Sequence, residues 1–314
     1  MSDEKRIVVA GATGLIGRAL SKRLIEKGYA LVVFSRDPDA AQKSIPGAAE
    51  YVAWQPELTG QWTSAIEGAY GVVNLAGAPF FTKWTEEYKR QVHDSRLYGT
   101  KGLIQAMKDA RVKPRVFVYG SSVGYYGYED ADKNAKIDEY TPAGKDFCGQ
   151  DSEELEQEAR EAEQIGVRTV LLRTGIVLDA RGGALPGQAG QFRRFFGGYV
   201  RPGNQWYPWI HIDDEVGLIL WALENEQVRG PVNGTAPEPQ TNRDFAATLG
   251  KVLNRPSWMP LPGSLLKLFL GEVSVTITHG RRVVPNKAQS LGYEFQYSKS
   301  EQAIRQLLNR KTSG

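Results

Sequence analysis

The sequence has a single cysteine, Cys148, among its 314 residues. One thiol excludes an internal disulfide and is typical of a protein from a reducing compartment. The sequence also lacks an apolar signal core near its start and any apolar run long enough to span a bilayer. We therefore expect a cytoplasmic protein, or the mature part of an organelle protein.

The sequence also lacks a large excess of positive or of negative residues. The chain has 39 Lys and Arg against 36 Asp and Glu, a net charge of +3, and its basic residues are scattered. This balance makes no electrostatic case for a nucleic acid or a membrane as partner. Histidine is equally scarce, and His211 has no cysteine or histidine neighbour in the sequence. We expect no metal site.

The most informative stretch is IVVAGATGLIGRAL, from Ile7 to Leu20. Its apolar, β-branched start predicts a buried parallel strand, and the pattern after Gly17 predicts a helix. Glycines at a strand-to-helix turn allow a tight bend, close approach of a pyrophosphate and close packing of the helix. The helix N-terminus then faces the phosphates. The expected cofactor contacts are Gly11, Thr13, Gly14, Leu15, Ile16 and Gly17.

The second predicted strand ends in Ser35 and Arg36. A chain that prefers NAD would carry an acid there, to bind the ribose hydroxyls. A guanidinium can instead pair with a 2′-phosphate, and Arg18 adds a second positive charge nearby. These residues favour NADP(H) over NAD(H). The alternative is that Arg36 is a solvated loop residue whose field Asp37 weakens.

Strands and helices alternate along the first 178 residues, which predicts an α/β fold with a doubly wound parallel sheet. The fourth strand ends in Leu75, Ala76 and Gly77, and small residues there would let a cofactor lie across the strand end. We expect a Rossmann domain at 1–178, with 209–235 returning to it. Residues 179–208 and 236–314 would form a smaller substrate domain. Trp209 to Asp214 should start a helix that Asp213 or Asp214 caps. The predicted strands are Ile7–Ala10, Ala30–Phe34, Tyr51–Trp54, Val72–Leu75, Arg115–Tyr119, Val167–Arg173 and Pro231–Asn233.

These motifs resemble those of the extended short-chain dehydrogenase/reductases: GATGLIG, NLAG, SSVGYYG, LLRTGIVL and WIHIDD. The narrower resemblance is to an atypical subfamily labelled as sugar-nucleotide epimerases, and as cell-division-inhibitor-like in photosynthetic organisms. It rests on KWTEEYK, DSRLYGT, NGTAPEPQTNRDFAATLGKVLNRP and LGEVSVTITHGRRVVPNKAQSLGYEF. The resemblance implies an NADP-binding Rossmann domain, a small C-terminal domain and an active site between them.

The chain departs from the resembled pattern at its catalytic pair. The superfamily uses a tyrosine four residues before a lysine, which lowers the pKa of the phenol. None of the 14 tyrosines here has that lysine, and Cys148 and Ser152 fall near the expected places. By the resemblance, Ser122 aligns with the catalytic serine, Ser121 borders the cofactor and Tyr126 borders the nicotinamide. Ser122 could equally bond only local backbone, and Tyr126 could be a core aromatic.

Four further residues are candidates for substrate binding: Arg96, Arg193, Trp206 and His211. Arg96 would bind an anion or form a buried ion pair, and Arg193 with Trp206 would hold a phosphate and a base or lie on an exposed face. His211 is as consistent with packing or a hinge. We expect either an NADP(H)-dependent oxidoreductase or epimerase with a small, nucleotide-linked substrate, or a cofactor-binding regulatory protein without turnover. The sequence leaves both a homodimer and a protein partner as alternatives.

The absent acid leads to a binding prediction. We expect NADP(H) to bind more tightly than NAD(H) by about tenfold to a hundredfold, because one charge-assisted pair contributes about 1.5–3 kcal/mol. Calorimetric titration of both cofactors should show this preference, and Arg36→Ala should remove it. Equal affinities in the parent, or a preference that survives the substitution, would contradict the prediction.

Overall fold

The computed structural model describes residues 5–56, 60–128 and 134–309. Its largest sheet has seven parallel strands in the order β12-β7-β5-β4-β1-β2-β3. The predicted doubly wound sheet is therefore confirmed, and each predicted strand begins within one residue of an observed one. The strands are β1 (Arg6–Ala10), β2 (Ala30–Ser35), β3 (Glu50–Ala53), β4 (Gly71–Asn74), β5 (Val116–Ser122), β7 (Arg168–Thr174) and β12 (Gly230–Gly234).

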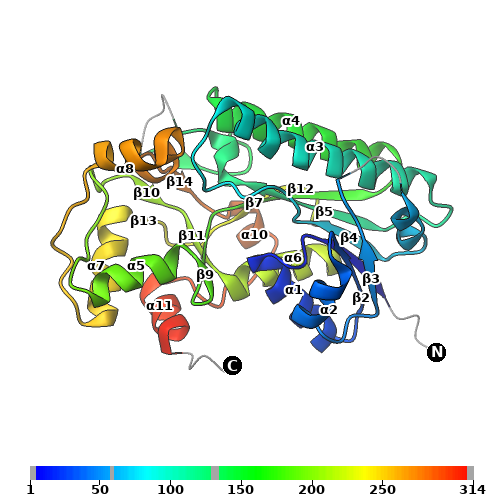
Figure 1. Cartoon of the computed structure of the whole chain (residues 1–314), viewed down its shortest axis with the longest axis horizontal. Coiled ribbons are helices and arrows are strands. Elements are labelled where there is room, and N and C mark those ends of the chain that lie inside the picture. The colour runs from blue at the N-terminus through cyan, green and yellow to red at the C-terminus, as the bar shows by residue number, and fades with distance from the viewer. Residues whose placement is uncertain (1–4, 57–59, 129–133, 310–314) are drawn as a thin grey trace.

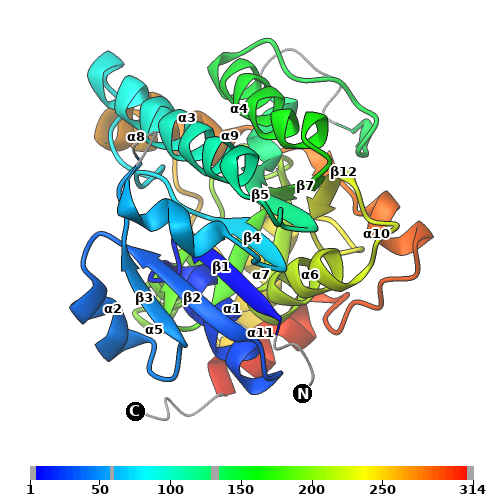
Figure 2. The ribbon, with the colours of Figure 1, turned by 90° about the vertical axis from the view of Figure 1, so that its right-hand side faces the viewer.

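Helices cover both faces of this sheet (Figures 1 and 2). Successive residues of β1 belong to different cores: Ile7 and Val9 to one, Val8 and Ala10 to the other. Side chains of a strand alternate between faces, so a run of apolar residues is what a sheet covered on both sides requires. The covering helices are α3 (Glu86–Asp109) and α4 (Phe147–Gln164) on one face and α1 (Leu15–Glu26) and α6 (Ile212–Glu224) on the other, with α2 (Pro38–Ser44) after β2.

The strand order reverses at β1, which determines where a ligand can lie. From β1 the chain builds outward through β2 and β3, and then returns to place β4 on the other side of β1. At such a switch point, the connections leaving the two strands diverge and open a crevice at the carboxyl ends. Gly11 follows β1 and Leu75 follows β4, so both predicted cofactor segments lie at this crevice.

A smaller part of the chain lies beside the carboxyl end of the sheet (Figure 1). It contains α5 (Ala184–Arg193), α7 (Asn242–Leu253), α8 (Gly263–Leu270), α9 (Val275–Thr278) and α11 (Ser300–Asn309), whereas α10 (Asn286–Ser290) packs against β12. The short strands are β6 (Lys136–Ile137), β8 (Ile176–Asp179), β9 (Gly182–Gly183), β10 (Trp206–Tyr207), β11 (Trp209–His211), β13 (Gln240–Thr241) and β14 (Arg282–Val283). The 3₁₀ turns are η1 (Gln61–Ile66), η2 (Val123–Tyr126) and η3 (Gly271–Ser274). In the described ranges, no helix has both the length and the apolar character to cross a membrane.

The predicted start of the helix after Trp209 is wrong. Trp209–His211 form β11, which pairs in parallel with β8, and α6 begins at Ile212. The N-cap is His211, whose Nδ1 accepts the backbone N–H of Asp213 at 3.0 Å, so neither predicted aspartate caps the helix. The pairing strand lies more than 30 residues earlier in the chain, so no local signal could reveal it.

A buried carboxyl lies at the start of α6. Glu215 is fully buried; its Oε1 accepts the Thr174 hydroxyl at 2.6 Å, and Oε2 has no partner among the described residues. Burial raises the pKa of Glu215 to about 8, because an ionised carboxylate loses its hydration there. Since the pKa is raised above its unfolded value, this group contributes stability in acid that is lost as the pH rises through 8.

Glu215→Gln should therefore stabilise the protein in mild base, because the amide has the shape of the carboxyl and cannot ionise. We expect the free energy of unfolding to rise on the order of 3 kcal/mol at pH 8 and by little at pH 4.5. Urea unfolding across this pH range measures the difference. Glu226→Gln, at an exposed position, is the control and should follow the parent at every pH. A Glu215→Gln variant that also follows the parent would show that Glu215 titrates normally.

Candidate active site

The glycine loop after β1 is built by close backbone contacts. Gly11 has φ +81°, and a Cβ there would lie 2.6 Å from the carbonyl carbon of Leu75. A Cβ on Gly17 would lie 2.2 Å from the Gly11 oxygen. Gly11 and Gly17 are thus required by the packing of the chain itself. Gly14 differs, because its Cβ would meet only the Gly11 oxygen, at 3.3 Å.

The N-terminus of α1 is open to an anion. Gly14 is its N-cap, no side chain caps it, and its first turn carries no acid. The first N–H groups of a helix have no intrahelical partner, and the helix dipole favours negative charge there. Arg18 donates to the Thr13 carbonyl, which holds the loop from its exposed side. Gly14 is exposed, and Leu15 and Ile16 are partly exposed. Together with the uncapped N–H groups, this surface fits the pyrophosphate of a dinucleotide.

Asn74 and Arg96 hold the segment after β4. The Asn74 side chain accepts the Ala76 N–H at 3.1 Å and donates to the Thr100 hydroxyl at 3.2 Å. Arg96 donates to the carbonyls of Val92 and Ala78, and its guanidinium lies where a Cβ on Gly77 would be. Arg96 therefore binds carbonyl oxygens in place of the expected buried ion pair, and it positions the Leu75–Gly77 segment.

The residue that follows β2 is an arginine whose charge has no partner in the described part of the chain. The Ser35 hydroxyl exchanges hydrogen bonds with the backbone of Asp37, whose carboxylate caps α2 through the Ala40 N–H at 2.9 Å. Arg36 is exposed, and no hydrogen bond or ion pair engages its guanidinium in the described part of the chain. Asp37 is thus used by α2, while Arg36 is free to meet a 2′-phosphate.

Ser122, Cys148 and Tyr128 meet around Gly124. A Cβ on Gly124 would lie 2.8 Å from the Ser122 oxygen, 3.6 Å from the Cys148 Cβ and 3.8 Å from the Tyr128 hydroxyl. Ser122 is exposed, and its oxygen accepts the Gly124 N–H at 2.9 Å. Cys148 is 5 % exposed, in the first turn of α4. Burial raises the pKa of Tyr128 well above its usual value, so its phenol keeps its proton at neutral pH. Tyr128 was not among the predicted residues, because no motif includes it.

The structure places Tyr126 in the core. It is 2 % exposed, its hydroxyl donates to Asn233 at 2.6 Å, and Arg173 donates to the same oxygen at 2.9 Å. Burial raises the pKa of the Tyr126 phenol, while the Arg173 charge acts in the opposite direction. A buried phenol with both hydrogen bonds satisfied has no access to a ligand, so the core-aromatic alternative describes Tyr126 better than a catalytic role.

Arg173 also pairs with Glu156 on α4. Its Nε and Nη2 donate to the two carboxylate oxygens at 2.9 and 2.8 Å, and both side chains are almost fully buried. Ser121, one of the predicted cofactor residues, donates to the same carboxylate at 2.7 Å. The Ser121 hydroxyl is therefore already engaged by the protein. The sequence did not indicate this network, because its members come from separate elements.

A cavity of about 670 Å³ opens beside the Cys148 corner. The start of α4 forms one wall, with Trp84, Phe147 and Cys148, and the C-terminal segment forms the other. Its positively charged side chains are Arg201 and Lys267, and His279 lines it too. The acids at its wall are engaged elsewhere: Glu272 pairs with Lys89 at 2.5 Å, and Asp146 accepts the Gly149 N–H at 2.9 Å. This cavity can take a small molecule with an anionic group.

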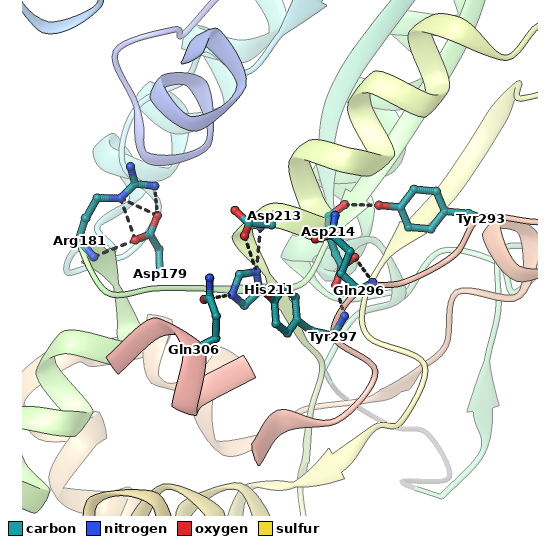
Figure 3. Close-up of polar contacts among 9 residues, drawn as sticks. All are labelled: Asp179, Arg181, His211, Asp213, Asp214, Tyr293, Gln296, Tyr297 and Gln306. Atoms are coloured by element: carbon teal, nitrogen blue, oxygen red, sulfur yellow. Dashed lines mark hydrogen bonds and ion pairs between the residues drawn. The ribbon is translucent and has the colours of Figure 1, made fainter. Parts of the chain in front are cut away.

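The other predicted substrate residues lie away from this wall. His211 is fully buried, bonds Gln306 through Nε2 at 2.9 Å and stacks on Tyr297 at 3.8 Å (Figure 3). It therefore packs and caps, as its alternative stated. Trp206 lies in β10 under the Arg282 guanidinium, and Arg193 is exposed at the end of α5. Neither lines the cavity. Within the described ranges, no cluster of three or more His, Cys, Asp or Glu is arranged to hold a metal ion.

Fold, glycine loop and motifs together define an extended short-chain dehydrogenase/reductase, and the chain belongs to the NAD dependent epimerase/dehydratase family. The profile of that family matches residues 7–233, and residues 261–307 match a domain of unknown function, DUF1731. The resemblance inferred from the motifs is thus confirmed.

Individual relatives show to which members of this family the chain is similar. The chain is 38 % identical over 304 residues to the epimerase family protein SDR39U1 homolog, chloroplastic, of Arabidopsis thaliana, covering 96 % of this chain and 86 % of that protein. It is 34 % identical to the epimerase family protein YfhF of Bacillus subtilis, over 98 % of this chain and 99 % of that protein. The crystal structure of human epimerase family protein SDR39U1 (isoform 2) with NADPH has TM-score 0.85, 29 % identity and coverage of 98 % and 100 %. UDP-glucuronic acid 4-epimerase from Bacillus cereus, at 18 % identity and TM-score 0.77, shares the fold over 96 % of this chain and 97 % of its own.

The open surface at Gly14 leads to a prediction about cofactor binding. Gly14→Val should abolish NADP(H) binding, because its side chain would occupy the space in front of the helix N-terminus, and the fold should persist. Calorimetry measures the affinity, and circular dichroism the fold. Gly187→Val on α5, where a Cβ meets nothing within 4 Å, is the control and should bind as the parent does. Tight binding by a folded Gly14→Val variant would remove this loop from the site.

Proposed function

We propose that the chain binds NADP(H) across Gly11–Gly17 and Leu75–Gly77 and acts as an oxidoreductase or epimerase on a small substrate in the Cys148 cavity. The observation that carries the proposal is the uncapped helix N-terminus beside an unpaired Arg36, at the switch point of the sheet. The human SDR39U1 structure with NADPH, which covers 98 % of this chain, supports it. A bound nicotinamide would supply or accept the hydride, and the protein would orient the substrate and move the proton.

Ser122 and Tyr128 are the groups best placed for the proton. Ser122 is exposed, with its oxygen close to Cys148, and Tyr128 brings a phenol to the same corner. Because burial raises the pKa of Tyr128, the phenol can donate a proton but is a poor base. No tyrosine of the sequence has the lysine four residues later that lowers the phenol pKa in the resembled pattern. We therefore infer slow turnover, since positioned proton transfer usually contributes about 10²–10⁴-fold.

The cavity favours a substrate with a phosphate or another anionic group. Arg201 and Lys267 are exposed at its wall, whereas the nearby acids already have partners. Trp84 and Phe147 supply an aromatic surface beside them. A nucleotide-linked small molecule combines these two features, which supports the substrate class expected from the resemblance.

A second candidate function is regulatory. The missing tyrosine–lysine pair and the low exposure of Cys148 also suit a protein that binds NADP(H) without turnover, so that cofactor occupancy controls its conformation. A second copy of the chain or a protein partner would then recognise the cofactor-bound conformation.

Assays of NADPH oxidation against sugar nucleotides, ketones and aldehydes separate the two functions. We expect low turnover by the parent and a further loss of about 10²-fold in Ser122→Ala and Tyr128→Phe. Tyr140→Phe, at a phenol that is 86 % exposed, should leave the rate unchanged. The double variant Cys148→Tyr, Ser152→Lys restores the resembled pair and should gain activity. Binding without turnover by both the parent and the double variant favours the regulatory function. Turnover insensitive to Ser122 and Tyr128 would show that the active site is misplaced.

A further inference from the structure

The hairpin formed by β8 and β9 lies against the N-terminus of α1. Its strands pair antiparallel, Leu178 with Gly183 and Asp179 with Gly182. A Cβ on Gly182 would lie 3.0 Å from the Leu15 side chain, and one on Gly183 would lie 3.4 Å from it. Leu15 is the first residue of α1, directly after the open Gly14. The hairpin therefore borders the surface at which a pyrophosphate would lie.

The tip of this hairpin carries Arg181, and Asp179 fixes its orientation. The Asp179 carboxylate is buried; it accepts the Arg181 backbone N–H at 2.8 Å, Nε at 3.0 Å and Nη2 at 2.5 Å. Figure 3 shows the pair on the hairpin, with the guanidinium on the side of the blue N-terminal segment. The Arg181 side chain is 54 % exposed, and none of these bonds uses its Nη1. A guanidinium held at one edge presents its remaining N–H groups in a fixed direction.

We propose that Arg181 is a cofactor ligand, which donates from its free edge to the pyrophosphate of NADP(H) or NAD(H) bound at the N-terminus of α1. This inference rests on the proposed function. It adds a side-chain cation, from a segment more than 160 residues away, to a site that the sequence motif describes as backbone N–H groups alone. Asp179 is the positioning residue: it orients Arg181, and it does not touch the cofactor.

The charges around Arg181 suit this role better than a purely structural ion pair. Asp179 engages the backbone N–H of Arg181 and one edge of its guanidinium, and it leaves the arginine side chain 54 % exposed. Hydrogen bonding to Asp179 and the charge of Asp213 raise the pKa of Arg181, so its guanidinium stays charged. The first turn of α1 has no acid that would compete for the guanidinium. An incoming pyrophosphate therefore meets both a helix dipole and an oriented arginine.

Arg181 and Arg36 should affect the two cofactors differently. NADP⁺ and NAD⁺ share the pyrophosphate, so Arg181→Ala should weaken both by the same factor, about tenfold to a hundredfold. Arg36→Ala should weaken only NADP⁺, because only NADP⁺ has a 2′-phosphate. Calorimetric titration of the purified full-length chain with each cofactor measures these affinities, and no catalytic assay is needed. Arg194→Ala, at an exposed arginine beyond α5, is the control and should bind both cofactors as the parent does.

Two further variants keep the test decisive. Arg181→Ala leaves the buried Asp179 without its cation, so the double variant Asp179→Asn, Arg181→Gln removes both charges and should show the same loss for both cofactors. Arg181→Lys should recover part of the affinity. Folded variants that bind NADP⁺ and NAD⁺ as tightly as the parent would overturn the role of Arg181. A loss confined to NADP⁺ would overturn it too, because it would place Arg181 at the 2′-phosphate. A parent that binds neither cofactor would instead refute the proposed function.

Discussion

The buried ion pair between Glu156 and Arg173 ties helix α4 to the sheet, one residue from Ser122 of the candidate site. Glu156 comes from α4 and Arg173 from β7, and the carboxylate also accepts the Ser121 hydroxyl at the end of β5. Through Tyr126 and Asn233 the same network reaches β12, and Asn233 continues to the Val284 carbonyl. Arg173 also lies 3.3 Å from the centre of the Tyr125 ring. Removing one partner of such a pair costs about 3–5 kcal/mol, because it leaves an uncompensated buried charge.

This network has a consequence for the catalytic groups. Arginine and tyrosine do meet in this chain, but in the core, where the phenol of Tyr126 keeps its proton and bonds Asn233. The polar pair that the resembled enzymes place on a helix in the active site is absent from α4, whose first turn carries Cys148. The cavity at that turn is instead lined by Arg201 and by Lys267 of the C-terminal segment. The cofactor edge and the substrate wall therefore come from separate parts of the chain.

The cofactor edge also combines local and distant residues. Gly11, Gly14 and Gly17 act within one turn, where a Cβ would meet neighbouring backbone or occupy the space before the helix. The β8–β9 hairpin with Arg181 follows β7 in the chain and reaches the same place. Glycines at its tip allow it to lie against Leu15. A glycine can thus serve either the close packing of the protein or the approach of a ligand, and only its surroundings distinguish the two.

The sequence by itself determined the parallel sheet, the glycine loop, the Arg36 that replaces an acid and the missing tyrosine–lysine pair. Apolar periodicity, glycine spacing and residue identity are local properties, which a single chain displays without its partners. Only the tertiary structure decided that Tyr126 and His211 are buried, that Arg96 holds a loop, that Tyr128 lies around Gly124 with Ser122 and Cys148, and that the hairpin of Arg181 lies against Leu15. Burial and contact depend on segments that are distant in sequence, such as β11 pairing with β8 or α4 facing the C-terminal segment, and no local pattern encodes those distances.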